Sequence, residues 1–174
     1  TRTTTIAITV ALTFLATTGN AQALQVGDTV SSVQVRDANN QPAWIPDLGK
    51  KVIAFFYTDP DVKDQNEPFR ELLHAAKLDE SRSRGMGVAN LKDTWKPNFL
   101  IRKIIRGKIE KFKSLILTDV DHTLKRQWNL GVTDDHDIVI IIGKDRKVYY
   151  FKAGPLTAAE RATGLALVKK LMAK

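Results

Sequence analysis

The stretch Val52-Ile-Ala-Phe-Phe-Tyr-Thr-Asp-Pro-Asp-Val-Lys-Asp64 decides the fold that the sequence predicts. It opens with a nearly unbroken apolar and aromatic run that is rich in β-formers, which is typical of a buried central strand. Asp59 and Pro60 end this strand and begin an acidic, exposed loop. After the loop, residues 68–76 place apolar side chains at i, i+3, i+4 and i+7, which predicts a helix. The sequence therefore predicts a strand, a loop and a helix in succession.

Composition limits the functions that the chain can have. Its 174 residues, 43% of them hydrophobic, are enough for one domain and a short appendage. The formal charge of +8 comes from 27 Lys and Arg against 19 Asp and Glu, and it favours anionic surfaces as partners. The sequence contains no cysteine, which excludes disulfides, thiol redox cycling and thiolate-bound metals.

Residues 1–23 have the pattern of a secretory signal peptide. Arg2 precedes an apolar run at 6–16, and Ala21-Gln-Ala23 resembles a cleavage site. A retained N-terminal membrane segment is the alternative, although the run is shorter than the ~20 residues that span a bilayer. We therefore expect a periplasmic or extracytoplasmic protein, which can be membrane-associated, with a single domain at 24–174.

The rest of the chain alternates predicted strands and helices. A capping box at Thr157 and Glu160 predicts the start of the last helix. The remaining predicted elements are an edge strand at 30–35, strands at 86–91 and 114–118, a short helix at 122–129, and a hairpin at 137–143 and 148–151.

The most basic segment, residues 98–113, is a predicted amphipathic helix. Its apolar residues recur at helical spacing, and cations fill the other face against one acid, Glu110. Such a helix suits a protein partner or an anionic membrane surface, whereas an ordinary surface helix with a solvated cationic face is the alternative. Nothing in the pattern indicates nucleic acid binding. The candidate contact residues are Arg102, Lys103, Arg106, Lys108 and Lys111.

From about residue 25 to its end, the chain resembles the thioredoxin-like superfamily. The resemblance rests on three segments: 49–57, 115–131 and 140–148. It is strongest to the redoxin and peroxiredoxin-like branch, and within that branch to the exported YtfJ-type proteins. The resemblance implies an α/β fold with a central mixed sheet flanked by helices.

The sequence departs from that superfamily at the redox site. The resemblance places a thiolate in the loop after the central strand, where this chain has Asp61 and Asp64. It also implies a cis-proline before the hairpin, where His136 or Asp137 stands. A carboxylate cannot form a disulfide or reduce a peroxide. We therefore expect a redox-inactive protein without a cofactor that acts as a binding or accessory subunit of a membrane or periplasmic complex.

A cation site is the second hypothesis. The two loops meet in the implied fold, so their carboxylates would lie close together and would favour a hard cation. Two solvated acidic loops are the simpler alternative. The candidate residues are Asp59, Asp61, Asp64, Asp134, Asp135 and Asp137.

A magnesium-dependent phosphatase is a weaker alternative. Asp119, Asp121 and Thr123 resemble the DxDxT motif of haloacid-dehalogenase-type phosphatases. That resemblance implies that the first Asp attacks phosphorus and that the second acts as acid and base. His122 stands where a tight turn calls for glycine, and the motif comes late in the chain. These departures disfavour a phosphatase.

Overall fold

The computed structural model describes residues 23–174, apart from the side chains of Lys111 and Phe112. The predicted signal or membrane segment, except for its last residue, lies outside the described residues. A seven-stranded sheet has the order β2-β1-β5-β4-β3-β6-β7. In chain order the strands are β1 (Gln34–Arg36), β2 (Pro42–Trp44), β3 (Val52–Thr58), β4 (Ser83–Asn90), β5 (Leu115–Asp119), β6 (Asp137–Ile142) and β7 (Val148–Ala153).

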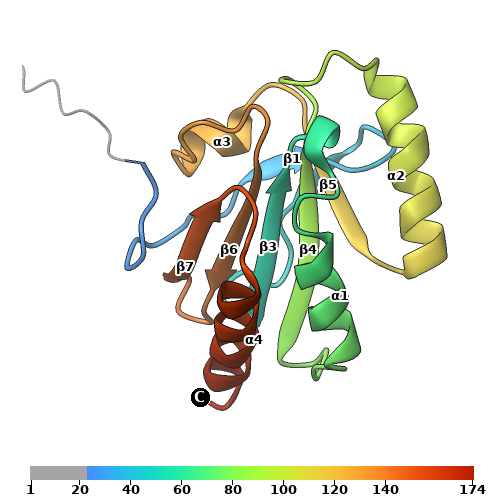
Figure 1. Cartoon of the computed structure of the whole chain (residues 1–174). Coiled ribbons are helices and arrows are strands. Elements are labelled where there is room, and N and C mark those ends of the chain that lie inside the picture. Colours follow the sequence, from blue (N-terminus) through green and yellow to red (C-terminus); the bar gives the residue numbers. More distant parts are fainter. Residues whose placement is uncertain (1–22) are drawn as a thin grey trace, which may run out of the picture.

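The sheet is mixed, and its centre is parallel. β3, β4 and β5 run in the same direction, whereas β6 is antiparallel to β3 and β1 is antiparallel to β5. The carboxyl ends of the three parallel strands therefore lie at the same end of the sheet, where β6 begins (Figure 1). The predicted α/β class with a central mixed sheet is confirmed.

Helices cover both faces of the sheet (Figure 1). α1 and α2 make the crossovers from β3 to β4 and from β4 to β5, and right-handed crossovers in the same direction lie on the same face. α4 packs beside α1 on this face, and α3 packs on the other. The helices are α1 (Glu67–Ala75), α2 (Asn98–Phe112), α3 (Thr123–Gln127) and α4 (Ala158–Met172), and a 3-10 turn, η1 (Pro60–Val62), follows β3.

The continuous apolar run of β3 reflects burial on both faces. Phe56 packs with Phe69 of α1 and Val168 of α4. Phe55, which points to the opposite face, packs at a tilt against Trp128 after α3, with ring centroids 5.0 Å apart. A strand that is covered on both sides has no polar face, and so its sequence does not alternate.

The predicted capping box begins α4. The Glu160 amide donates to Thr157 Oγ1 at 3.3 Å, and the Thr157 amide donates to Glu160 Oε2 at 2.7 Å. Lys152 and these Thr157 contacts lower the pKa of Glu160 to about 2. Local sequence signals therefore located this helix start correctly.

Among the described residues, no helix combines the length and the apolar character that crossing a membrane requires. The basic helix α2 lies on the surface of the domain. Its buried side is narrow, because only Ile101 and Ile105 of its described side chains are buried, against Ala89 and Leu91.

Candidate functional site

The loops that follow β3 and precede β6 are in contact, as the implied fold requires. The Asp59 amide donates to the His136 carbonyl at 3.0 Å, and the Asp135 amide donates to Asp59 Oδ2 at 2.8 Å. The two loops meet because Thr58, the last residue of β3, is paired with Asp137, the first residue of β6. The position of a redox site in the implied fold therefore lies where β3 ends and β6 begins.

The structure brings together only three of the six acidic candidates for a cation site. Carboxylate oxygens of Asp59, Asp134 and Asp135 lie within 4.8 Å of one another. Asp59 is buried, and its Oδ1 already accepts a hydrogen bond from the Asp61 amide at 2.8 Å. The other two carboxylates are exposed.

Each of the three remaining acidic candidates forms an ion pair with a basic side chain of the protein. Asp61 is ion-paired with Lys96, although the two residues lie 35 positions apart. Asp64 is paired with its neighbour Lys63, whose hydrogen bond lowers the pKa of Asp64. Both positions at which the resemblance places a thiolate are therefore held by lysines.

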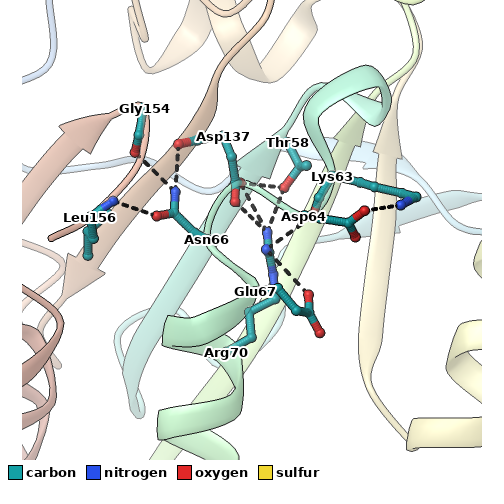
Figure 2. Close-up of polar contacts among 9 residues, drawn as sticks. All are labelled: Thr58, Lys63, Asp64, Asn66, Glu67, Arg70, Asp137, Gly154 and Leu156. Carbon is teal, nitrogen blue, oxygen red and sulfur yellow. Dashed lines mark hydrogen bonds and ion pairs between the residues drawn. The ribbon is translucent and has the colours of Figure 1, made fainter. Parts of the chain in front are cut away.

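Asp137 is the centre of a buried ion pair (Figure 2). Its side chain is 0% exposed, and Arg70 Nη2 donates to Oδ2 at 2.8 Å and to Oδ1 at 3.0 Å. Thr58 Oγ1 donates to Oδ1 at 2.6 Å. Burial raises the pKa of Asp137, and Arg70 and Thr58 oppose the rise. The Arg70 guanidinium also lies over the Phe56 ring, 4.3 Å from its centroid.

Asn66, which precedes α1, joins three backbone segments near this ion pair (Figure 2). Its Nδ2 donates to the carbonyls of Asp137 and Gly154, both at 3.1 Å. Its Oδ1 accepts from the Leu156 amide at 2.8 Å. This fully buried side chain thus fixes the loop after β3 to the start of β6 and to the segment that leads into α4. Sequence analysis did not identify Asn66, because its partners lie 71 to 90 residues away.

Asp119, at the end of β5, is also buried. Its Oδ2 accepts from Tyr57 Oη at 3.0 Å and from the Lys125 amide at 3.1 Å. Burial, and then the Asp119 charge, raise the pKa of Tyr57. Asp121 accepts from Thr123 Oγ1 at 2.7 Å, which lowers the pKa of Asp121. The DxDxT residues thus bond to neighbouring strand and helix groups, and a buried Asp119 is badly placed for nucleophilic attack.

A second polar cluster lies beside Asp119. The sequence alone did not predict it. Asp93 accepts from Asn90 Nδ2 at 2.6 Å and from Thr133 Oγ1 at 2.7 Å. His122 Nε2 lies 2.7 Å from Asp93 Oδ1. Burial raises the pKa of Asp93, but the hydrogen bonds from Thr133 and Asn90 and the charges of His122 and Lys125 together lower this pKa overall. The cluster ties the loop after β4 to the loops after β5 and before β6.

The five cationic candidates all lie in α2 but have different environments. Arg102 Nη2 donates to Asn40 Oδ1 at 2.7 Å, and Arg106 Nη1 donates to the Ala38 carbonyl at 3.0 Å. These arginines fasten α2 to the turn between β1 and β2. Lys103 is exposed and Lys108 is half-buried, whereas the side chain of Lys111 lies outside the described residues.

Large apolar side chains are exposed next to those lysines. Trp95 is 82% exposed, Phe99 74%, Ile104 45% and Leu100 41%. Lys96 Nζ lies 5.2 Å from the centroid of the Trp95 ring. We call this region the α2 surface, and it consists of Trp95, Lys96, Phe99, Leu100, Lys103, Ile104 and Lys108.

Comparison with known proteins places the chain in a family. A family model described as a bacterial protein of unknown function, YtfJ_HI0045, matches residues 46–171, from the approach to β3 to the end of α4. The chain belongs to this family. A comparison with curated proteins found no significant match.

Solved structures show the fold of this YtfJ_HI0045 family member. BsSco, a member of the Sco family of cytochrome c oxidase assembly proteins, is similar with a TM-score of 0.61 and 12% identity, over 87% of this chain and 97% of BsSco. A peroxiredoxin-like protein from Aquifex aeolicus has a TM-score of 0.59 and 16% identity, over 87% and 90% of the two chains. The exposed lipoprotein thioredoxin Etrx1 from Streptococcus pneumoniae has a TM-score of 0.60 and 13% identity, over 81% and 100%. The thioredoxin-like fold is therefore confirmed, and so is the predicted resemblance.

Proposed function

We propose that the protein is a redox-inactive, exported thioredoxin-like module that acts as a binding or accessory subunit of a membrane or periplasmic complex. The α2 surface is its contact face. The observation that carries the proposal is the exposure of Trp95, Phe99, Leu100 and Ile104 beside lysines, because large exposed apolar side chains that gather together mark interaction sites on soluble domains.

The residues at the end of β3 and the start of β6, where the implied fold has its redox site, support a binding role. The chain has no cysteine, and thiol–disulfide exchange requires a thiolate. Asp61 is ion-paired with Lys96, and Asp137 with Arg70. Both acids lie where the implied fold would hold its redox groups. These pairs tie the loops together and leave no activated nucleophile at either position.

Two of the fold relatives make an exported accessory role reasonable. One belongs to a family of oxidase assembly proteins, and another is an exposed lipoprotein. The apolar run and the Ala21-Gln-Ala23 pattern in this sequence support export independently of the fold.

Site-specific cross-linking tests the proposal. A photoreactive phenylalanine at position 100 lies on the α2 surface, and the same residue at position 166 lies on the exposed side of α4. In intact cells we expect position 100 to give discrete adducts of defined mass that co-migrate with a native envelope complex. The control at position 166 should give none of them. Identical adducts from both positions, or none from either, would refute the proposed contact face.

A cation bound by the loops after β3 and before β6 is the second candidate function. The observation that favours it is the group formed by Asp59, Asp134 and Asp135. Both carboxylate oxygens of Asp59 accept a hydrogen bond from a backbone amide, so each oxygen has one lone pair left for a metal ion. With two of three carboxylates exposed, we expect weak binding, with a dissociation constant on the order of 1 mM.

Calcium and magnesium titrations followed by amide chemical shifts test the second candidate. Binding should move the amide signals of Asp59 and Asp135 together, and Asp134→Asn with Asp135→Asn should abolish the response. Asp64→Asn is the matched control, because Asp64 lies in the loop after β3, as Asp59 does, but pairs with Lys63. An Asp64→Asn effect as large as that of the double variant would contradict this site.

A further inference from the structure

The outward side of α2 presents apolar side chains and lysines on one arc. Residues follow one another by about 100° around a helix, so Phe99, Leu100 and Ile104 fall within roughly 140°. Lys103 lies inside this arc, and Lys108 lies about 40° beyond Ile104, on the flank of the helix that leads to the buried Ile101. The buried residues Ile101 and Ile105 lie on the opposite side of the helix. The apolar exposure is thus directed away from the domain.

The aromatic residues gather at the start of α2. Trp95 lies in the loop before the helix and Phe99 in its first turn, and both are more exposed than Leu100 and Ile104. Trp is enriched at the level of lipid head groups, and interfacial helices combine Trp, Phe and Leu on one face with Lys and Arg on the other. This end of α2 therefore has the composition of an interfacial segment.

The different environments of the arginines and lysines of α2 favour a lipid partner over a protein partner. Both arginines of α2 donate a hydrogen bond to the turn between β1 and β2, Arg102 to Asn40 and the exposed Arg106 to Ala38. Among the described side chains of α2, the cations that make no such bond are the lysines. Protein interfaces are enriched in Arg and depleted in Lys. Lysines extend readily from an apolar surface to anionic head groups. The only acid in α2, Glu110, lies on the same side but in the last turn, far from Trp95.

From this arrangement we infer that the α2 surface binds directly to an anionic lipid bilayer, with Trp95 and Phe99 entering the interface and Lys103 and Lys108 contacting the head groups. The inference rests on the proposed function, for which it names the partner. The bound orientation places α2 against the membrane and leaves α4 in water.

Vesicle binding by the full chain tests this inference. The probes are phosphatidylcholine vesicles with and without phosphatidylglycerol, and the protein carries Trp44→Phe, which removes the other exposed tryptophan. Trp128 is 3% exposed, so a blue shift on binding reports Trp95. We expect sedimentation with the anionic vesicles and a blue shift of the emission, both weakened by salt.

Charge variants provide the matched comparison. Lys103→Gln with Lys108→Gln should weaken binding to anionic vesicles by roughly 30-fold, because each lysine near an anionic surface contributes about fivefold. Lys169→Gln with Lys170→Gln on exposed α4 makes the same charge change and should have little effect. Every variant keeps residues 1–22, so differences between the two pairs report the α2 surface. Lys103, Lys169 and Lys170 are exposed and Lys108 is half-buried, so circular dichroism checks that each variant folds.

The outcomes separate this inference from the proposed function. Equal losses in the two double variants, equal binding to neutral vesicles, or an unchanged Trp95 emission would overturn the lipid inference. If position 100 cross-links to a protein while no vesicle binds, the accessory role stands and the lipid partner is wrong. If both experiments fail, the α2 surface is an ordinary solvated helix face.

Discussion

Replacing Arg70 by methionine is expected to lower the free energy of unfolding by about 3 kcal/mol. The substitution leaves Asp137, whose side chain is 0% exposed, as a buried carboxylate without its counter-charge. Breaking a buried ion pair from one side costs about 3–5 kcal/mol, and the lower end applies because the Arg70 side chain is 26% exposed. Urea denaturation of the two proteins under the same conditions measures the difference.

Two comparisons test whether the cost arises from the buried charge. Arg70→Met combined with Asp137→Asn removes both charges and should be about 1–2 kcal/mol more stable than Arg70→Met alone. Glu67→Gln removes the other acid that is ion-paired with Arg70. Its carboxylate lies 3.8 Å from Arg70 and is 45% exposed, so the substitution should cost less than about 1 kcal/mol. Asp137→Asn alone completes the cycle. If its effect and that of Arg70→Met add up to the effect of the double variant, the ion pair does not couple the two positions as we infer.

The parts of the fold that could be predicted from the sequence are those with local signals. β3 was predictable because a strand covered on both faces is a continuous apolar run. The start of α4 was predictable because Thr157 and Glu160 satisfy each other's amides within one turn. The short edge strand β2 was missed. Its three residues pair only with β1, and the turn-forming residues before Pro42 hid that pairing.

The candidate site was less predictable, because its contacts join distant parts of the chain. The sequence placed Asp61, Asp64 and Asp137 in two adjoining loops but could not show that Lys96, Lys63 and Arg70 bind them. Charge counting also treated the cations of α2 alike. The structure assigns Arg102 and Arg106 to contacts with the turn between β1 and β2, because α2 packs against that turn.

Helical periodicity predicted α2 but overestimated its buried side. Leu100 and Ile104 have the spacing of core residues and are nonetheless 41% and 45% exposed. The sheet ends near α2 at two short strands, β1 and β2, so a helix there meets less of the core than α1 or α4 does. Periodicity shows which residues share a side of a helix, but it does not show how much of that side finds a partner.

Asn66→Ala is expected to destabilise the protein by about 3 kcal/mol, although it removes no charge and little apolar contact. The Gly154 carbonyl and the Leu156 amide would lose their Asn66 partners in a buried region, and each unsatisfied buried group costs about 1–3 kcal/mol. The Asp137 carbonyl would suffer less, because it also accepts from the Gly154 amide at 3.2 Å. Urea denaturation measures the loss of stability.

Hydrogen exchange distinguishes this cause from a general loosening of the fold. The Leu156 amide should exchange faster in Asn66→Ala by more than the loss of global stability explains, whereas amides in the centre of β3 should follow global stability. Asn66→Asp keeps an acceptor for Leu156 but no donor for Gly154, so it should restore protection at Leu156 alone. Asn39→Ala, in an exposed turn, should change stability by less than about 0.5 kcal/mol. If Asn66→Ala matched Asn39→Ala, or if Leu156 kept its protection, Asn66 would not be what joins the loop after β3 to the start of α4.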